Sequence, residues 1–312
     1  MIYAQMAMFI SQSAKITRDP FSEVLATLGA RSVRGTGLEA SGDWALAFDG
    51  RARLKFVALT HGQCWLLLPD HPPQALVQGD VFLLSNTRYT VASDPALEPI
   101  DGMSLYASPG QDIVRLGDGR ETLMMGGGSG FADGSASFVL DALPTFLRID
   151  RTSPSAEAVA RTLMSLQAEV NHGAVGGSLI AERLAEILVV EAVRAYVATS
   201  PSDSVGWITA LADPRIGKAL RLMHSDAARR WTAPMLAAEV GMSRSAFTDR
   251  FSARVGCPPI DYLTRWRMLL AHQKLDAGQA VATVARTVGY NSQSAFAHAF
   301  KRTLGRTPRS GN

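Results

Sequence analysis

The segment Val281 to Pro308 carries side chains that could read DNA bases. Its apolar spacing predicts a helix that ends at Gly289, followed by a second helix that Asn291 or Ser292 can cap. A short helix with two buried Phe side chains and a small, polar and basic outer face suits a DNA major groove. An ordinary amphipathic hairpin would explain this segment alone equally well. The two faces of the second helix are Ala295, Phe296, Ala299 and Phe300 on one side, and Ser294, Ala297, His298, Lys301 and Arg302 on the other.

A second copy of the pattern favours the DNA-binding interpretation. Residues 237–259 repeat the Ser-Ala-Phe sequence with a second Phe four residues later, and Gly241 corresponds to Gly289 with one residue inserted in the later turn. Between the copies, Ile260–Leu275 has the apolar spacing of one connecting helix. We therefore predict helix-turn-helix units at about 233–254 and 281–303 that enter successive major grooves. The matched positions are Phe247, Phe251, Gly256 and Pro259, which recur 49 residues later as Phe296, Phe300, Gly305 and Pro308.

The outer faces of these helices supply the candidate DNA contacts. Asp249 could accept a hydrogen bond from a cytosine amino group, Gln293 could pair with adenine, and His298 could donate to guanine. Arg244, Lys301 and Arg302 suit phosphate contacts, which position a protein without specifying sequence. The predicted DNA-binding residues are Ser243, Arg244, Ser245, Thr248, Asp249, Ser252, Ser292, Gln293, Ser294, His298, Lys301 and Arg302.

These motifs resemble the DNA-binding domain of the AraC/XylS family of transcription regulators over residues 215–312. The most specific part is GYNSQSAFAHAFKRTLGRTP, and YLTRWRM resembles the linker helix of that family. The resemblance implies that Ser245, Thr248 and Asp249 read bases. His298 departs from the family pattern, where Arg is common, which affects the base preference of the second unit.

Charge is distributed unevenly along the chain, although the formal net charge is only +3. Residues 214–312 hold 16 Lys and Arg against 5 Asp and Glu, whereas the preceding 213 residues hold 15 against 23. A basic block that coincides with the repeated motif indicates a polyanionic partner for the C-terminal part only.

The two cysteines, Cys64 and Cys257, lie in different predicted domains, which favours a reduced intracellular protein over a disulfide scaffold. The apolar first ten residues lack a basic n-region and a cleavage site. No apolar run reaches the ~18–20 residues that span a bilayer. We expect a cytoplasmic protein with no membrane partner.

The first half of the chain indicates a β-rich domain, because short apolar runs alternate with Gly, Pro and Asp. The stretch HGQCWLLLPDHPPQALVQGDVFLL resembles the core of a cupin, and a cupin-like N-terminal domain occurs in one subgroup of AraC-type regulators. We therefore predict an α+β protein: a cupin-like antiparallel β-barrel or jelly roll at 1–150, a helical connector at 151–204, and an all-α double helix-turn-helix domain at 205–312. The candidate strands are Trp44–Phe48, Leu54–Leu59, Cys64–Leu68, Val81–Leu84, Thr122–Met125 and Phe146–Ile149, after a short helix at Phe21–Leu28.

Two kinds of chemistry are conceivable in this domain. His61, Asp70 and His71 could supply the two histidines and one carboxylate of an iron site, but all three lie in or beside turns and the His-x-His pair of metal-holding cupins is absent. Polar turn residues are the simpler interpretation, so we expect no metal, no cofactor and no enzyme. Alternatively, Phe48 and other aromatic side chains could line an apolar cavity for a small molecule, or simply fill the core. The predicted ligand-binding residues are Trp44, Phe56, His61, Cys64, Trp65 and Tyr89.

Three further segments bear on regulation. Cys64 could sense a redox signal if a cation lowered its pKa, although beside Trp65 it suits a packed core position. Gly126–Gly130 lacks the Gly-Lys-Ser/Thr of a phosphate loop and is predicted to be a flexible connection. The helix expected from Ser178 has a broad apolar face that could pair with a second copy or pack on its own domain.

These observations together predict a one-component, sequence-specific transcription regulator whose cupin-like domain senses a small molecule or a redox signal. Promoter DNA, RNA polymerase, a small-molecule effector and a homodimer partner are the expected partners. A metal-dependent cupin enzyme fused to a DNA-binding domain, or a non-specific architectural DNA binder, are the alternatives. The sequence leaves open whether the protein activates or represses.

Overall fold

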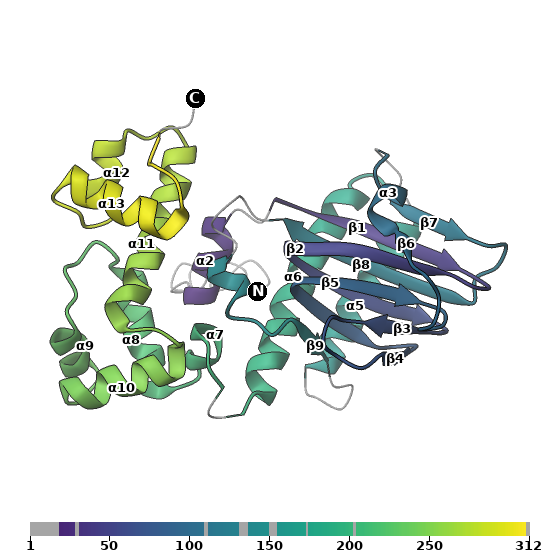
Figure 1. Cartoon of the computed structure of the whole chain (residues 1–312), viewed down its shortest axis with the longest axis horizontal. Coiled ribbons are helices and arrows are strands. Elements are labelled where there is room, and N and C mark those ends of the chain that lie inside the picture. Colours follow the sequence, from purple (N-terminus) through teal and green to yellow (C-terminus); the bar gives the residue numbers. More distant parts are fainter. Residues whose placement is uncertain are drawn as a thin grey trace, which may run out of the picture. The chain divides into compact units, whose positions relative to one another are not determined.

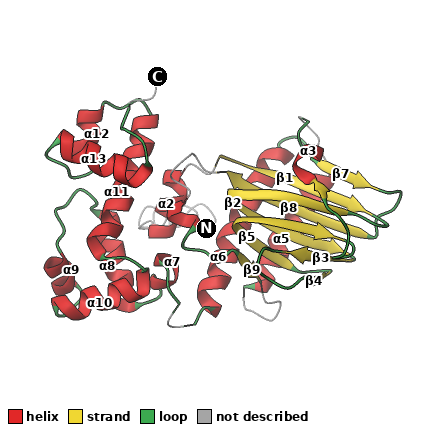
Figure 2. Ribbon diagram, in the orientation of Figure 1, coloured by secondary structure: helices red, strands yellow, loops and turns green. Residues whose placement is uncertain are grey.

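The chain forms a sheet-bearing unit and a helical unit (Figures 1 and 2). The computed structural model describes residues 19–28, 31–108, 112–130, 137–149, 155–172, 174–201 and 204–309. The sheet unit contains the described residues of 31–212 together with 250–258, and the helical unit contains those of 19–28, 213–249 and 259–309. The boundaries predicted at 150 and 204 stay predictions.

One mostly antiparallel sheet carries the sheet unit. Its strand order is β4-β3-β5-β2-β8-β1-β7, with β6 paired to β2 and β9 paired to β5. The pairs β1–β7 and β2–β6 are parallel, and the others are antiparallel. The strands are β1 (Arg31–Ala40), β2 (Ala45–His61), β3 (Gln63–Leu67), β4 (Gln74–Val77), β5 (Val81–Ala92), β6 (Ile100–Asp101), β7 (Ile113–Leu116), β8 (Thr122–Gly130) and β9 (Phe146–Arg148).

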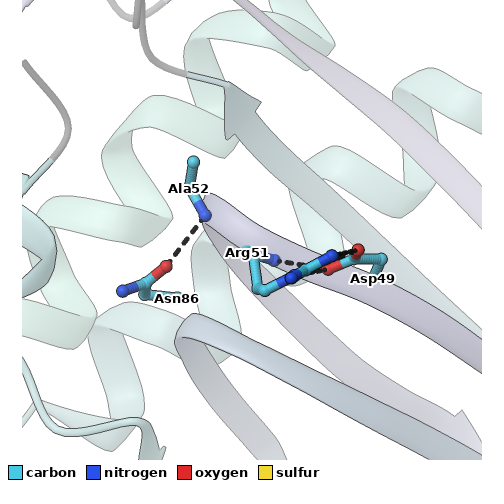
Figure 3. A network of polar contacts seen from close by, with 4 residues as sticks. All are labelled: Asp49, Arg51, Ala52 and Asn86. Atoms are coloured by element: carbon cyan, nitrogen blue, oxygen red, sulfur yellow. Dashed lines mark hydrogen bonds and ion pairs between the residues drawn. The ribbon is translucent and has the colours of Figure 1, made fainter. Parts of the chain in front are cut away.

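Strand β2 corrects the prediction of two separate strands at Trp44–Phe48 and Leu54–Leu59. Both segments belong to one strand that pairs with β5 on either side of an irregularity between Gly50 and Leu54. Residues 51–53 lie opposite Asn86 and form a bulge, in which Ala52 has a φ of 55° and its amide donates to Asn86 Oδ1 at 2.9 Å (Figure 3). A bulge accommodates extra residues without ending the strand.

The predicted flexible connection at Gly126–Gly130 is also wrong, because these residues form the second half of β8. Strand β8 lies between β1 and β2, and Gly128 pairs with Arg34 on one side and Lys55 on the other. The glycines therefore sit in the middle of the sheet. Backbone hydrogen bonds to two neighbouring strands hold these glycines in place, although glycine has no side chain to pack.

Helices α5 and α6 pack on each other beside the sheet (Figure 1). α5 is Ala156–His172 and α6 is Gly177–Thr199, and α6 contacts β1 and β5. The predicted helix start at Ser153-Pro154, the residue Gly173 in the predicted break and residues 202–203 of the predicted linker lie outside the described residues. Shorter helices of this unit are α3 (Gly102–Leu105), α4 (Ser137–Leu140) and α7 (Trp207–Ala210).

The helical unit contains the helices of both predicted helix-turn-helix units except the second half of α10. α9 and α10 correspond to the first predicted unit, α12 and α13 correspond to the second, and α11 lies between them in the chain. The second half of α10 groups with the sheet unit. The helices are α8 (Pro214–Ser225), α9 (Ala233–Glu239), α10 (Arg244–Val255), α11 (Pro259–Asp276), α12 (Val281–Thr287) and α13 (Gln293–Leu304).

An N-terminal helix also belongs to the helical unit. The helix predicted at Phe21–Leu28 is present as α2 (Pro20–Leu28), but it packs on α8 and α11 rather than opening the sheet unit. Val24 is fully buried, and the Glu23 carboxylate lies 3.3 Å from Nδ1 of His224, whose Nε2 lies 2.7 Å from the Tyr262 hydroxyl. The first described residues of the chain thus complete the core of its C-terminal half.

Candidate nucleic-acid interface

Helix α13 begins at a serine cap. Ser292 has an extended backbone, and its Oγ accepts a hydrogen bond from the Ala295 amide at 3.3 Å. That oxygen also lies 2.8 Å from Oγ of Ser294. Such a cap satisfies one of the free amides in the first turn, so it fixes where the helix starts. Phe296 and Phe300, both buried, fix which face points inward.

Helix α10 begins in the same way. Ser243 Oγ accepts from the Ala246 amide at 3.3 Å and lies 3.4 Å from Ser245 Oγ. Phe247 and Phe251 are fully buried, as their counterparts in α13 are. The sequence repeat therefore corresponds to a repeat of local structure. Ser243 and Ser292, both predicted to contact DNA, therefore act as helix caps in the structure.

The remaining predicted contacts are accessible. Arg244, Ser245 and Asp249 of α10 are exposed, whereas Thr248 and Ser252 are partly buried. The Thr248 hydroxyl donates to the Arg244 carbonyl at 2.9 Å, which leaves its methyl group and oxygen lone pair for an outside partner. In α13 the exposed predicted residues are Gln293, Ser294, His298, Lys301 and Arg302.

The basic side chains of α13 carry uncompensated charge. Within the described part of the chain, neither Lys301 nor Arg302 has an ion-pair partner. Both lie in the last turn of the helix. A lysine or arginine held at a surface without a carboxylate is available to a phosphate.

The second helix-turn-helix unit is braced by the loop that follows α8. Arg267 of α11 donates from Nε to the Ala227 carbonyl at 2.7 Å and from Nη2 to the Arg229 carbonyl at 2.8 Å. The turn residue Gly289 has a φ of 87°, and a Cβ there would lie 2.5 Å from the Ala228 carbonyl oxygen. Only glycine fits, so the turn and the loop are held together.

The sheet unit contains a cavity of about 420 Å³ above strands β1, β2 and β8. Phe48 and Tyr89 stack at one side with ring centroids 5.1 Å apart. Tyr106, just after α3, donates its hydroxyl to the Gly37 carbonyl at 2.9 Å and so ties α3 to β1. Burial raises the pKa of Tyr106 to about 12, so this phenol stays a neutral donor.

Of the residues predicted to bind a ligand, Tyr89 lines this cavity, and Phe48 from the same aromatic group lines it too. Trp44 and Cys64 lie in the same buried sheet core as Tyr89 but do not line the cavity. Trp65, next to Cys64, lies on the opposite face of its strand and is only partly buried. Phe56 is buried but does not line the cavity, and His61 is exposed at the end of β2.

Lys55 and Arg53 line the cavity and were missed by sequence reasoning. Lys55 interrupts the apolar run Leu54–Leu59, and this charge within a buried strand was the available signal. Burial lowers the pKa of Lys55 to about 8.

The thiol and the candidate iron ligands have surroundings that do not suit their hypothetical roles. Burial raises the pKa of Cys64 to about 12, whereas a reactive thiol needs a lowered pKa. Asp70 and His71 are exposed in a turn, and the His71 Nδ1 lies 2.8 Å from the Pro69 carbonyl oxygen. Among the residues that the structure describes, no three His, Cys, Asp or Glu side chains come together as metal ligands could.

Within the same described ranges, no helix combines the length and the apolar character needed to cross a bilayer.

Comparison with known proteins places these units in a family. A family model described as a cupin matches residues 19–198, and one described as a helix-turn-helix domain matches residues 236–310. A putative AraC-like transcription regulator of Streptomyces antibioticus is 39% identical over 293 residues, which are 93% of this chain and 97% of that protein. The regulator AlkR of Acinetobacter baylyi is 29% identical over 281 residues, 87% of this chain and 92% of that protein.

Among solved structures, the DNA-binding domain of the global transcriptional factor AdpA in complex with target DNA is 30% identical, with a TM-score of 0.30. The match covers 31% of this chain and 87% of the AdpA domain. The Streptomyces antibioticus and Acinetobacter baylyi relatives are both named as transcription regulators, and the two family models confirm the predicted fold class of a cupin domain followed by a helix-turn-helix domain. The chain belongs to the AraC family of DNA-binding transcription regulators, with an N-terminal cupin domain and a C-terminal helix-turn-helix domain.

Proposed function

We propose that the protein is a one-component regulator that recognises a specific promoter sequence with α10 and α13. The observation that carries this proposal is the structural repeat of the two helices. Each begins at a serine cap with a second serine two residues later, each buries two Phe side chains, and each exposes short polar side chains. Small polar side chains can approach base edges closely, which a merely solvated helix does not require.

Within α13, base reading and phosphate binding fall on different residues. Gln293 and Ser294 lie in the first turn, where a recognition helix contacts base edges, and His298 follows one turn later on the same outer face. Lys301 and Arg302 lie at the other end and suit the backbone. Asp249 of α10 would repel phosphate, so we assign it to discrimination among bases rather than to affinity.

Anisotropy on DNA from upstream of the protein's own gene, compared with a scrambled duplex across a salt series, tests this division. Gln293→Ala should cost ~1–3 kcal/mol at one base pair and leave the salt slope unchanged. Lys301→Ala should weaken all sequences alike and reduce the salt slope by about 1. Lys274→Ala, a matched control on the connecting helix α11, should do neither. Uniform loss of affinity in both test variants would overturn the assignment, and no site preference in the wild type would indicate a non-specific binder.

The sheet unit is the proposed sensor, and its signal is a small molecule. The cavity of about 420 Å³ falls within the ~300–1,000 Å³ range of small-molecule sites and joins aromatic, aliphatic and polar side chains. A redox signal through Cys64 is the weaker alternative because of that thiol's burial and raised pKa. Anisotropy with and without reductant separates the two.

A homodimer is part of the proposal. Leu179, Ile180 and Ile187 of α6 and Met164 of α5 are between 44% and 63% exposed, although the opposite side of α6 is buried. Exposed apolar side chains gathered on one helical hairpin suit a second copy of the same surface. RNA polymerase stays a predicted partner.

A further inference from the structure

Lys55 crosses the sheet over a strip of glycines. It lies on β2, yet its Nζ donates at 2.8 Å to Oγ1 of Thr36 on β1, with β8 between these two strands. A Cβ at Gly126 would lie 3.1 Å from Lys55 Cε, and one at Gly128 would lie 3.2 Å from Lys55 Cδ. The glycines of β8 therefore clear the path along which the lysine reaches its partner.

The ammonium at the end of this path has no acidic partner. Within the described residues no carboxylate forms an ion pair with Lys55 or with Arg53, the second cation that lines the cavity. Asp49 also lines the cavity, but its carboxylate accepts from Arg51 Nε at 2.8 Å and 3.1 Å (Figure 3). Arg51 holds the pKa of Asp49 well below its usual range.

The cavity is therefore lined by two cations, Lys55 and Arg53, and by one carboxylate, Asp49, that is already paired with Arg51. At pH 7 the ammonium remains the main form of Lys55, since its lowered pKa of about 8 is still above neutrality. Lys55 is partly buried and Arg53 is exposed, so an anion from outside can reach both and would compensate the partly desolvated charge of Lys55. The rest of the lining is mostly apolar or aromatic, including Phe48, Val57 and Tyr89.

We propose that the cavity binds a small organic acid, with its carboxylate on Lys55 beside Arg53 and its apolar or aromatic body against Phe48 and Tyr89. This inference rests on the proposed function of the sheet unit as a small-molecule sensor and names the class of molecule. The Thr36 hydroxyl accepts from Lys55 and donates its own hydrogen to the Gly126 carbonyl at 3.2 Å, so it positions the ammonium for the carboxylate. The stacked rings supply a flat apolar wall, and the carboxylate would make charge-assisted hydrogen bonds.

Calorimetric titration of the full-length protein provides the test. The probes are phenylacetate, 3-phenylpropanoate and 4-phenylbutanoate, each compared with its primary amide, which has the same shape without the charge. We expect at least one carboxylate to bind at least ~10-fold more tightly than its amide. Lys55→Met should remove that preference, a loss of about 10- to 100-fold for the carboxylate and little for the amide. Equal binding of acids and amides, or no binding of any acid at millimolar concentration, would overturn the proposal.

Two further variants control for structural damage. Thr36→Val keeps the ammonium and should keep the preference for the acid, and Lys274→Met removes a partly buried lysine from the helical unit and should change nothing. If Lys55→Met fails to fold, the comparison of acids with amides on the wild type still decides, and Lys55→Arg, which keeps the charge, should retain the preference.

DNA binding measured on the same samples separates the two proposals. Site-selective DNA binding without acid preference would overturn only the ligand class. Acid preference without site-selective DNA binding would overturn only the proposed regulator function.

Discussion

Substituting alanine for Gly289 should destabilise the second helix-turn-helix unit far more than the same change does at the corresponding turn of the first. Gly289 and Gly241 both have positive φ, at 87° and 66°. Alanine in this conformation costs roughly 1–2 kcal/mol at either position. At Gly241 nothing lies within 4 Å of the added Cβ, so that cost should be the whole effect.

At Gly289 the added Cβ meets backbone. It would lie 2.5 Å from the Ala228 carbonyl oxygen and 3.0 Å from Arg267 Nη2, so the loop after α8 would have to move by roughly 1 Å to reach ordinary contact. That movement strains the hydrogen bonds from Arg267 to the carbonyls of Ala227 and Arg229. Losing one hydrogen bond to a charged group adds about 1.5–3 kcal/mol, which gives a total of about 2.5–5 kcal/mol.

Native-state hydrogen exchange of the full-length protein, read by mass spectrometry, measures the opening free energy of each unit separately. Gly289→Ala should lower the opening free energy of α12 and α13 by about 2.5–5 kcal/mol, and Gly241→Ala should lower that of α9 by about 1–2 kcal/mol. Gly305→Ala, another open position with positive φ at the end of α13, is a second control and should behave like Gly241→Ala. Equal losses at Gly289 and Gly241 would refute the idea that the loop contact dominates.

Three further results are expected. With a pKa of about 12, Cys64 should react with iodoacetamide at pH 8 at least ~100-fold more slowly than Cys257, and mass spectrometry showing equal labelling would contradict its burial. Burial lowers the pKa of His224 in spite of the nearby Glu23 carboxylate, so the unfolded chain binds more protons. The stability contributed by neutral His224 is then complete above its usual pKa of 6.5 and decreases as the pH falls below it. Thermal unfolding of His224→Gln should lack this acid-side decrease, and an unchanged pH profile would assign the effect to other groups. If α6 forms the homodimer, Ile187→Lys should shift the mass measured by light scattering from dimer to monomer, whereas a wild-type monomer would rule the dimer out.

The DNA-binding half was predictable because its information is local. The spacing of Phe247 and Phe251, the glycine at each turn and the serine before each helix define the elements within a few residues of one another. Propensity, capping and periodicity then agree on the same structure.

The sheet unit was less predictable because its pairings are distant in sequence. The local sequence around Gly126 and Gly128 predicts a flexible connection. Their strand partners on β1 and β2 lie about 70–90 residues earlier in the chain, where no local pattern reveals them. The position of Lys55 was unpredictable for the same reason. Its ammonium reaches Thr36 past Gly126 and Gly128, and these residues are far from Lys55 in the sequence.

The membership of α2 in the helical unit has a consequence for how the protein is made. α2 leaves the ribosome early, yet its partners α8 and α11 begin at Pro214 and Pro259. Roughly 185 residues separate α2 from α8, so at ~5–20 residues per second the helix waits on the order of 10–40 s for its first partner. Until α8 and α11 are synthesised, the side chains of Phe21 and Val24 lack the partners against which they are buried in the folded protein, and they face water or a chaperone.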